Sequence, residues 1–198
     1  MREETSVLIA SMILESRRLI LRPMERGDED DLFSYQSDPE TVRFIPWPVR
    51  TREQVEEALD RAIAATSFEN DGDFKLFVWV LKENGKVIGQ SNISIEAKIH
   101  KRGEIGWVVN PEYAGKGYAL EATQTLLDFA FTTWDFNRIV ALMDVRNKSS
   151  ISLAERLGMR REGEYKEDEF FKGEWADSYL YAILRREWKA SGFSKVKV

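Results

Sequence analysis

The segment EIGWVVNPEYAGKGYALEA, residues 104–122, reads as a strand, a glycine-rich turn and the start of a helix. Apolar side chains alternate within residues 105–109, which is typical of an extended strand. Pro111 cannot donate a backbone hydrogen bond, so regular pairing should stop there. Gly115 and Gly117 permit a sharp turn and a close approach of backbone N–H groups to a ligand. Because the first N–H groups of the following helix lack partners inside that helix, the segment predicts an anion site suited to phosphate.

Two familiar phosphate-binding patterns are incomplete in this turn. The Walker pattern requires an earlier glycine, five residues before Gly115, and a serine or threonine after Lys116, and the chain has neither. The dinucleotide fingerprint would have its third glycine where Leu120 stands. A tight turn that binds nothing is the alternative, so the ligand has to be identified from the rest of the chain.

The composition is that of one globular domain. The chain has 198 residues, of which 43% are hydrophobic and 32% charged, and this is enough for a substantial core. Its net charge of −5 argues against a nucleic-acid partner. The absence of cysteine excludes disulfides, thiolate nucleophiles and cysteine-ligated zinc. The sole histidine, His100, lies in a polar stretch where we expect it on the surface, and we predict no metal site.

Nothing in the sequence predicts a membrane partner. No apolar run approaches the roughly 20 residues that a membrane-spanning helix needs. The apolar residues 7–14 follow an acidic start and lack the basic region and the length of a signal peptide. We therefore expect a cytoplasmic protein, either a monomer or a homodimer.

The order of expected elements predicts an α/β (α+β) fold in a single domain. We expect a central mixed, mostly antiparallel sheet of about seven strands, flanked by about four helices. Residues 14–188 would form this domain, residues 1–13 a loose extension and residues 189–198 a frayed tail. The expected strands are 19–21, 74–81, 87–95, 104–109, 139–145, 159–171 and 175–184, and the expected helices are 28–36, one opening at Thr51 with a Thr51/Gln54 capping box, 118–134 and 147–157. Asn84-Gly85 predicts a hairpin turn, Asp38-Pro39 a break, and residues 44–48 a rigid aromatic loop.

The strand–helix–strand segment 104–145 predicts a parallel pair with a right-handed crossover. Ligands of open α/β sheets bind beyond the carboxyl ends of such strands. Residues 108–118 and 145–150 should therefore meet at one site.

Four segments together resemble the GNAT N-acetyltransferase superfamily, and within it the RimJ/RimL-type branch. They are LILRP at residues 19–23, NPEYAGKGYALEA at 110–122, NKSSI at 147–151 followed by LGM at 157–159, and WADSYLY at 175–181. They look like the branch's opening strand, its acyl-CoA loop and helix, its second conserved block and its closing strand. The match extends over residues 14–188, nearly the whole domain.

This resemblance implies acetyl-CoA as the cofactor. Its pyrophosphate would lie on the backbone N–H groups of residues 115–119, with Lys116 adding charge nearby or standing free in solvent. The family separates its two central strands to admit the pantetheine arm, so strand backbone and an asparagine would bind that arm. The N–H of Val109 would face the thioester oxygen and stabilise the developing oxyanion. The implied cofactor-binding residues are Trp107, Val108, Val109, Gly115, Lys116, Gly117, Tyr118, Ala119 and Asn147.

The sequence departs from the family at two positions. The family usually has Gln or Arg at the start of the pyrophosphate loop, and here Glu112 stands there, so its side chain should point away from the phosphates. Many relatives carry a tyrosine as general acid where this chain has Ala154. The resemblance to the RimJ/RimL branch suggests Ser150 instead.

Glu104 and Ser150 are the predicted catalytic residues. An α-amine has a pKa of about 8 and a lysine amine about 10.4, so the α-amine needs less help to lose its proton. Glu104 could accept that proton directly or through a water, or it could be an ordinary carboxylate at a strand end. Ser150 could donate a proton to the thiolate, or only orient the sulfur.

The acceptor is least determined by the sequence. We expect an acetyl-CoA-dependent N-acetyltransferase that acts on the α-amine of a protein N-terminus by direct attack in a ternary complex. The alternatives are transfer to a small amine (an amino acid, a polyamine or an antibiotic), a longer acyl donor, and a non-catalytic acyl-CoA-binding module. A protein acceptor predicts an open groove, and a small amine predicts a pocket closed by Pro46-Trp47-Pro48. Phe44, Trp47, Glu167 and Asp177 could reach the acceptor side.

Overall fold

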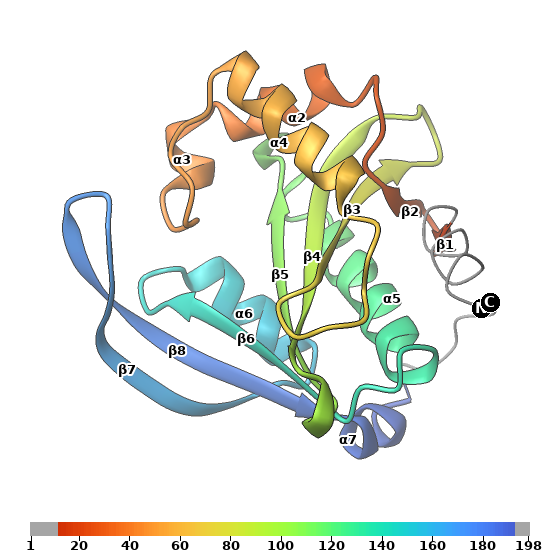
Figure 1. Cartoon of the computed structure of the whole chain (residues 1–198), viewed down its shortest axis with the longest axis vertical. Helices are drawn as coiled ribbons and strands as arrows, with labels where there is room; N and C mark the ends of the chain where they lie inside the picture. The colour runs from red at the N-terminus through yellow and green to blue at the C-terminus, as the bar shows by residue number, and fades with distance from the viewer. Residues whose placement is uncertain (1–11, 193–198) are drawn as a thin grey trace.

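The computed structural model describes residues 12–192, which form one mixed sheet with helices on both faces (Figure 1). The eight strands lie in the order β1-β2-β3-β4-β5-β6-β8-β7, and every neighbouring pair is antiparallel except β5 and β6. They are β1 (Leu14–Glu15), β2 (Leu19–Pro23), β3 (Phe74–Leu81), β4 (Val87–Ala97), β5 (Arg102–Val109), β6 (Arg138–Asp144), β7 (Arg160–Phe171) and β8 (Glu174–Leu184). The predicted mixed sheet is confirmed, and the strand beyond the expected seven is the two-residue β1, too short to leave a pattern in the sequence.

The described residues contain six α-helices and two 3₁₀ turns. They are α2 (Glu29–Gln36), α3 (Pro39–Val42), α4 (Arg52–Ala64), η1 (Lys98–His100), η2 (Pro111–Tyr113), α5 (Tyr118–Thr132), α6 (Lys148–Arg156) and α7 (Arg185–Ala190). The four expected helices are α2, α4, α5 and α6. Helix α7 runs to Ala190, past the expected start of the tail, and most of the expected N-terminal extension lies outside the described residues. No helix of residues 12–192 is long and apolar enough to cross a membrane.

Helix α3 corrects one expectation. Asp38-Pro39 ends α2, as predicted, but it also starts a new turn of helix. The Asp38 carboxylate accepts hydrogen bonds from the backbone N–H groups of Glu40 and Thr41, and Pro39 occupies the first turn. Proline suits that position because its fixed φ is helical and its missing N–H would have had no partner there. The same two residues therefore stop one helix and cap the next.

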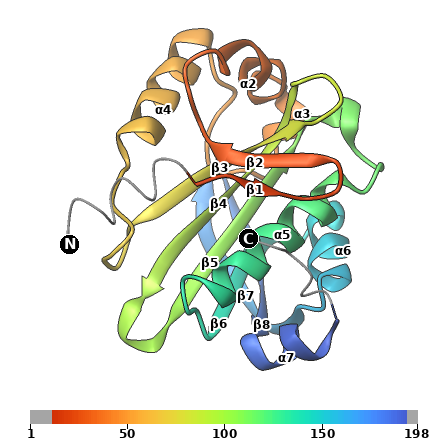
Figure 2. The same ribbon diagram turned by 90° about the vertical axis from the view of Figure 1, so that its right-hand side faces the viewer.

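Two hydrophobic cores lie on the two faces of the sheet. Helices α5, α6 and α7 pack on one face, and α2 and α4 cover part of the other (Figure 2). Strand β5 contributes to both, because Ile105 belongs to the α5 core and Val108 to the α2 core. Successive side chains of a strand alternate between faces, so Glu104 lies on the same face as Val108.

Local sequence signals set several of these elements. Thr51 and Gln54 form the predicted capping box at the start of α4. The hairpin between β3 and β4 turns at Asn84-Gly85, where Gly85 has a φ of +74°. The C-terminal carbonyl of α4 is held by a buried lysine, because Lys75 Nζ donates to the Ala65 carbonyl. This last contact joins residues of two elements and has no local signal.

Strands β5 and β6 are paired only at one end. Their parallel register joins Arg102 to Arg138, Gly103 to Ile139 and Glu104 to Val140, and no pair follows. Beyond Glu104 the two strands diverge, as Figure 1 shows. The separation lies on the stretch of β5 that leads into the glycine-rich turn, so it positions the site.

Candidate active site

A cavity of about 430 Å³ lies beside the open end of β5 and the starts of α5 and α6. We call it the cleft. Its walls come from the end of β5, the turn before α5, the start of α6 and the region of α3. Most residues that the sequence assigned to cofactor binding line it: Trp107, Val108, Val109, Gly115, Gly117, Tyr118, Ala119 and Asn147, together with Ser150.

The open edge of β5 presents backbone groups to the cleft. The N–H of Asn110 donates to the Ile88 carbonyl of β4 at 2.9 Å, and the next pair in the register is Val109 with Gly89. Hydrogen-bonded and non-bonded pairs alternate along an antiparallel ladder. The N–H and C=O of Val109, and those of Trp107, therefore point away from β4 into the region that β6 leaves unpaired.

The glycine-rich turn has the conformation that its sequence predicted. Gly115 and Gly117 have φ values of +74° and +80°, in the left-handed region that side chains disfavour. Gly117 is the N-cap of α5 and supplies no side-chain acceptor, so the first N–H groups of the helix stay available. A Cβ on Gly115 would meet nothing within 4 Å. The chain itself does not fill the space in front of this turn, which suits an anionic ligand.

Lys116 and Glu112 lie outside the lining of the cleft. The Lys116 ammonium donates to the Glu112 carbonyl at 3.0 Å and lies 5.2 Å from the centroid of the Tyr113 ring. These contacts direct Lys116 back onto the turn η2. The Glu112 side chain is exposed, in keeping with the expectation that it points away from the phosphates.

Arg18 supports the turn from β2, and sequence reasoning missed it. Its guanidinium donates to the Lys116 carbonyl at 3.1 Å and to Glu121 Oε2 at 2.7 Å, and it lies 4.3 Å from the centroid of the Tyr118 ring. Burial alone would raise the pKa of Glu121, but hydrogen bonds from Ser16 and Arg18 outweigh burial and hold this pKa below its usual value. The network ties β2 to the first turns of α5. Arg18 and Glu121 are far apart in the chain, so no local sequence motif predicts their contact.

Asn147 and Ser150 face the cleft from the start of α6. The Asn147 side-chain oxygen accepts from the Ser150 N–H at 3.1 Å and from the Ser149 hydroxyl at 2.9 Å, which confirms the predicted helix cap. Its amide nitrogen has no acceptor among residues 12–192. Trp107 Nε1 donates to Ser150 Oγ at 3.3 Å, so the serine hydrogen stays available for another partner. Both side chains are thus held in place, and the Asn147 amide and the Ser150 hydroxyl can each still donate to a ligand.

Glu104 occupies the last paired position before the strands separate. It stands opposite Ser94 of β4 and Val140 of β6, is half-buried, and is not among the residues that line the cleft. Burial raises its pKa, and the nearby charge of Glu96 raises it further. A carboxylate with a raised pKa is a stronger proton acceptor near neutral pH. Glu104 faces the side of the sheet that carries α2 and α4.

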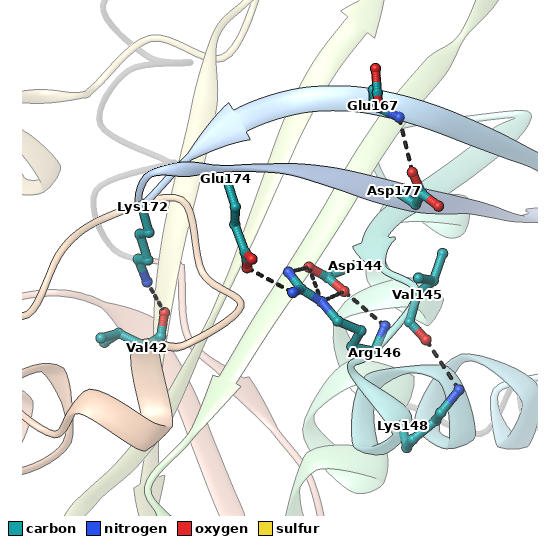
Figure 3. Close-up of polar contacts among 9 residues, drawn as sticks. All are labelled: Val42, Asp144, Val145, Arg146, Lys148, Glu167, Lys172, Glu174 and Asp177. Atoms are coloured by element: carbon teal, nitrogen blue, oxygen red, sulfur yellow. Dashed lines mark hydrogen bonds and ion pairs between the residues drawn. The ribbon is translucent and has the colours of Figure 1, made fainter.

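The β7–β8 hairpin approaches the α3 side of the cleft (Figure 3). Lys172 Nζ donates to the Val42 carbonyl at the end of α3. Arg146 bridges Asp144 and Glu174, at 2.6 and 2.7 Å, which holds the end of β6 to the hairpin. Burial alone would raise the pKa of Asp144, but the hydrogen bonds of Arg146 outweigh it and lower this pKa.

The four residues proposed to reach the acceptor side are not brought together. Phe44 lines the cleft, whereas Trp47 lines a different cavity. Asp177 accepts from the Glu167 backbone N–H at 2.9 Å and pairs with Lys166, also at 2.9 Å, so it is engaged within the hairpin. Residues 46–48 do not close the cleft.

These features fit a phosphate-bearing carrier with an extended, amide-containing arm. The backbone N–H groups at the start of α5 would bind phosphate, and the unpaired edge of β5 would form hydrogen bonds with amides. Comparison with known families identifies the class of protein, because a model of the Acetyltransferase (GNAT) domain matches residues 18–160. The chain belongs to this family and is an N-acetyltransferase.

Similar proteins support this assignment over most of the chain. YnaD of Bacillus subtilis (strain 168), an uncharacterized N-acetyltransferase, is 34% identical over 178 residues, which are 89% of this chain and 99% of YnaD. The crystal structure of a GNAT-family acetyltransferase from Bacillus anthracis is 33% identical, with a TM-score of 0.80 over 88% of this chain and 99% of that one.

Two more distant structures share the fold and act on different amines. Spermidine N-acetyltransferase from Vibrio cholerae, in complex with CoA and spermine, has a TM-score of 0.73 at 24% identity, over 87% of this chain and 98% of that one. RimL, a ribosomal L7/L12 alpha-N-protein acetyltransferase, has a TM-score of 0.77 at 21% identity, over 87% and 94%. The family uses acetyl-CoA, and its acceptors are amines.

Proposed function

We propose that this chain acetylates the α-amine of a protein N-terminus by direct attack of the amine in a ternary complex with acetyl-CoA. The observation that carries this proposal is the position of Glu104. It is a half-buried carboxylate with a raised pKa, at the point where the two central strands separate. A proton acceptor therefore stands beside the opening through which a thioester would reach the other face of the sheet.

The chain's own residues divide into two groups around acetyl-CoA, which supplies the acetyl group as a reactive thioester. The backbone N–H groups at residues 115–119 would hold the pyrophosphate. The free N–H and C=O groups of Trp107 and Val109, with the spare amide of Asn147, would hold the pantetheine arm. The open left-handed turn and the unpaired strand edge support these roles.

Proton transfer would involve two side chains. Glu104 would accept the proton of the incoming amine, directly or through a water. Ser150, which already accepts from Trp107, would turn its hydrogen toward the sulfur. An α-amine, with a pKa of about 8, needs only modest help from such a base. Holding the reactants in line would supply a large share of the rate.

The shape of the cleft favours a protein acceptor. A small amine predicted a pocket closed by residues 46–48, and these residues are absent from the lining of the cleft, although Trp47 lines a second cavity on the face of Glu104. Glu40, Thr41 and Phe44 line the cleft instead. An exposed chain end could enter along this side, and RimL, which shares the fold, acts on a protein α-amine.

A small polyamine is the second candidate. The acidic β7–β8 hairpin favours it, because the hairpin contacts α3 through Lys172 and carries Glu164, Glu167, Asp168, Glu169, Glu174 and Asp177. A polyamine is a flexible polycation, and acidic surfaces attract polycations. The Vibrio cholerae neighbour with CoA and spermine shows that this fold accommodates one.

The test is acetyl-CoA turnover, followed by free-thiol detection, against N-terminal peptides, amino acids, polyamines and aminoglycosides. We expect turnover with a peptide and none with the same peptide blocked at its α-amine. Turnover only with spermidine or spermine would replace the proposed acceptor by the second candidate. Tight acetyl-CoA binding with no turnover across the panel would favour a non-catalytic acyl-CoA-binding module.

We also propose a cytoplasmic location, which the absence of cysteine supports. A monomer and a homodimer are both compatible with the site, because every residue assigned to it comes from one chain.

A further inference from the structure

A second cavity, of about 330 Å³, lies on the sheet face opposite α5, under helices α2 and α4. We call it the back cavity. Its walls are mostly apolar and include Met24, Leu32, Val55, Leu59 and Leu76. Its volume falls within the range of small-molecule sites. The reaction proposed above makes no use of it.

Two arginines on the wall of the back cavity, Arg50 and Arg61, have no acidic partner among residues 12–192. Arg50 is half-buried, and its guanidinium donates to Gln36 Oε1 at 2.6 Å and lies 4.7 Å from the centroid of the Trp47 ring. Burial lowers the pKa of Arg50, and the positive charge of nearby Arg61 lowers it further. Neither arginine forms an ion pair with any described residue. In a chain with 34 acidic residues, two adjacent cations without a carboxylate are an unusual arrangement.

One neutral donor on the wall of the back cavity also lacks a partner. Trp47 Nε1 is buried and has no hydrogen-bond partner among residues 12–192. The Tyr35 hydroxyl and Gln36 Nε2 both donate to Gln90 Oε1, at 2.9 and 2.8 Å. Gln90 Oε1 thus already accepts from two donors, and Gln36 Oε1 accepts from Arg50, so the Trp47 indole and the two arginines are left to bind a ligand. Buried donors are costly when they stay unpaired, so this wall favours a ligand that only accepts.

We propose that the back cavity binds a small carboxylic acid with an apolar body. Its carboxylate would accept from Arg50, Arg61 and the Trp47 indole, and its body would replace water against the apolar wall. Guanidinium groups suit carboxylates because their donors match the two oxygens. A cation would meet two like charges here, and a neutral alcohol would leave both charges uncompensated.

The back cavity shares a wall with the cleft. Gln90 of β4 pairs with Val108 of β5, which lines the cleft. Ile45 lines the cleft, whereas Trp47, two residues later, lines the back cavity. A bound acid would therefore adjoin the acetyl-transfer site. It would be either the acidic part of the acceptor or a separate effector, and both have the same chemistry.

The test is calorimetry on the full chain with phenylacetate and with phenylacetamide, its uncharged analogue of similar shape. We expect phenylacetate to bind and the amide to bind on the order of tenfold more weakly, since a charge-assisted bond is lost. Arg50→Gln and Arg61→Gln should each weaken phenylacetate by a similar factor. Arg186→Gln, an exposed change on α7, is the matched control and should leave binding unchanged.

Absence of phenylacetate binding, equal affinity for the acid and the amide, or wild-type binding by both arginine variants would overturn the proposal. Arg61 is exposed, so its variant decides the matter if Arg50→Gln does not fold. Competition between phenylacetate and an acceptor peptide would assign the site to the acceptor, and simultaneous binding would assign it to an effector. Calorimetry needs no turnover, so the outcome is independent of the proposed acceptor.

Discussion

The two ends of strand β5 are built for different tasks. At its amino end, residues 102–104 pair with both β4 and β6, so the backbone is satisfied and only side chains can act. At its carboxyl end, Trp107 and Val109 pair with β4 alone, and their outward N–H and C=O groups have no strand partner within residues 12–192. Under the proposed function, chemistry at the first end would depend on the carboxylate of Glu104, and binding at the second would depend on backbone conformation.

This contrast separates two kinds of substitution. A change of side chain at the paired end should alter turnover and leave acetyl-CoA affinity intact. A change of backbone conformation next to the open end should alter affinity first.

Glu104→Gln should lower turnover about a hundredfold with acetyl-CoA affinity unchanged, because general-base catalysis typically contributes at least that much. Burial raises the pKa of Glu104, and Glu96 adds to the shift, so the active ionised form grows as pH rises through this raised pKa. The acidic limb of kcat/KM should therefore lie above the ordinary glutamate value of about 4.3 and vanish in the variant. Steady-state kinetics across pH, with calorimetry for affinity, measure both.

Glu96→Gln is the matched control for this variant. It removes the neighbouring charge, so the acidic limb should move to lower pH while turnover at its plateau is kept. The raised pKa of Glu104 also means that its contribution to stability is present at low pH and lost as pH rises through that value. Glu104→Gln should thus be at least as stable as the wild type at neutral pH. Wild-type turnover in Glu104→Gln would remove the carboxylate from the mechanism.

Gly117→Val should weaken acetyl-CoA binding on the order of thirtyfold, because a branched side chain forces the left-handed turn to shift and misaligns its N–H donors. Gly117 has a φ of +80°. Calorimetry gives the affinity directly. Turnover at saturating acetyl-CoA should change far less.

Gly72→Val is the control that separates the effect of backbone strain from the loss of the N–H groups at the start of α5. Gly72 lies away from the cleft and has a φ of +86°, so a valine there should have a backbone strain comparable to that of Gly117→Val. An added Cβ at Gly72 would meet nothing within 4 Å. Its variant should lose stability, about 1–2 kcal/mol, and keep its affinity for acetyl-CoA. Equal affinity losses in the two variants would contradict the assignment of these N–H groups to acetyl-CoA binding.

The strand, turn and helix of residues 104–122 were predictable because each depends on local chemistry. Periodicity identified the strand, and glycine identified the left-handed turn. The parallel pairing followed from the connection between β5 and β6. Helix α3 was missed because Asp38-Pro39 is the same signal for a break and for a capped start.

Side-chain direction and long-range partners had no such signal. Lys116 belongs to the turn, yet its ammonium bonds to the Glu112 carbonyl and leaves the cleft lining. Arg18 reaches the turn from β2, and nothing near it in sequence suggests this. The back cavity combines segments from Met24 to Gln90, so it exists only in the folded chain.

Ser150→Ala should lower turnover about fivefold, less than the loss of Glu104, because a hydroxyl is a weak acid and mainly orients its partner. Acetyl-CoA affinity should stay within about twofold, since the Asn147 cap bonds to the serine backbone and survives. Trp107→Phe removes only the indole donor to Ser150 Oγ, and it should produce a smaller loss than Ser150→Ala. A larger loss in Trp107→Phe would show that the indole, rather than the hydroxyl, matters for transfer.

Arg18→Gln should have the smallest effect on acetyl-CoA, about a threefold loss of affinity, because Arg18 supports the turn and does not line the cleft. The variant should also lose about 1–2 kcal/mol of unfolding free energy, since its bonds to Glu121 are charge-assisted and partly buried. Urea unfolding at several pH values measures this loss.

The unfolding free energy that Arg18→Gln loses should depend on pH. The pKa of Glu121 is lowered in the folded chain, so its stabilising contacts are present above the unfolded value and lost as pH falls through the folded one. The difference between Arg18→Gln and the wild type should therefore shrink in acid. Arg52→Gln breaks an exposed pair with Asp30 on another face, so it should leave the free energy of unfolding and the affinity for acetyl-CoA close to those of the wild type. If Arg18→Gln matched Arg52→Gln in both respects, the open end of β5 would depend on backbone conformation alone, without support from β2.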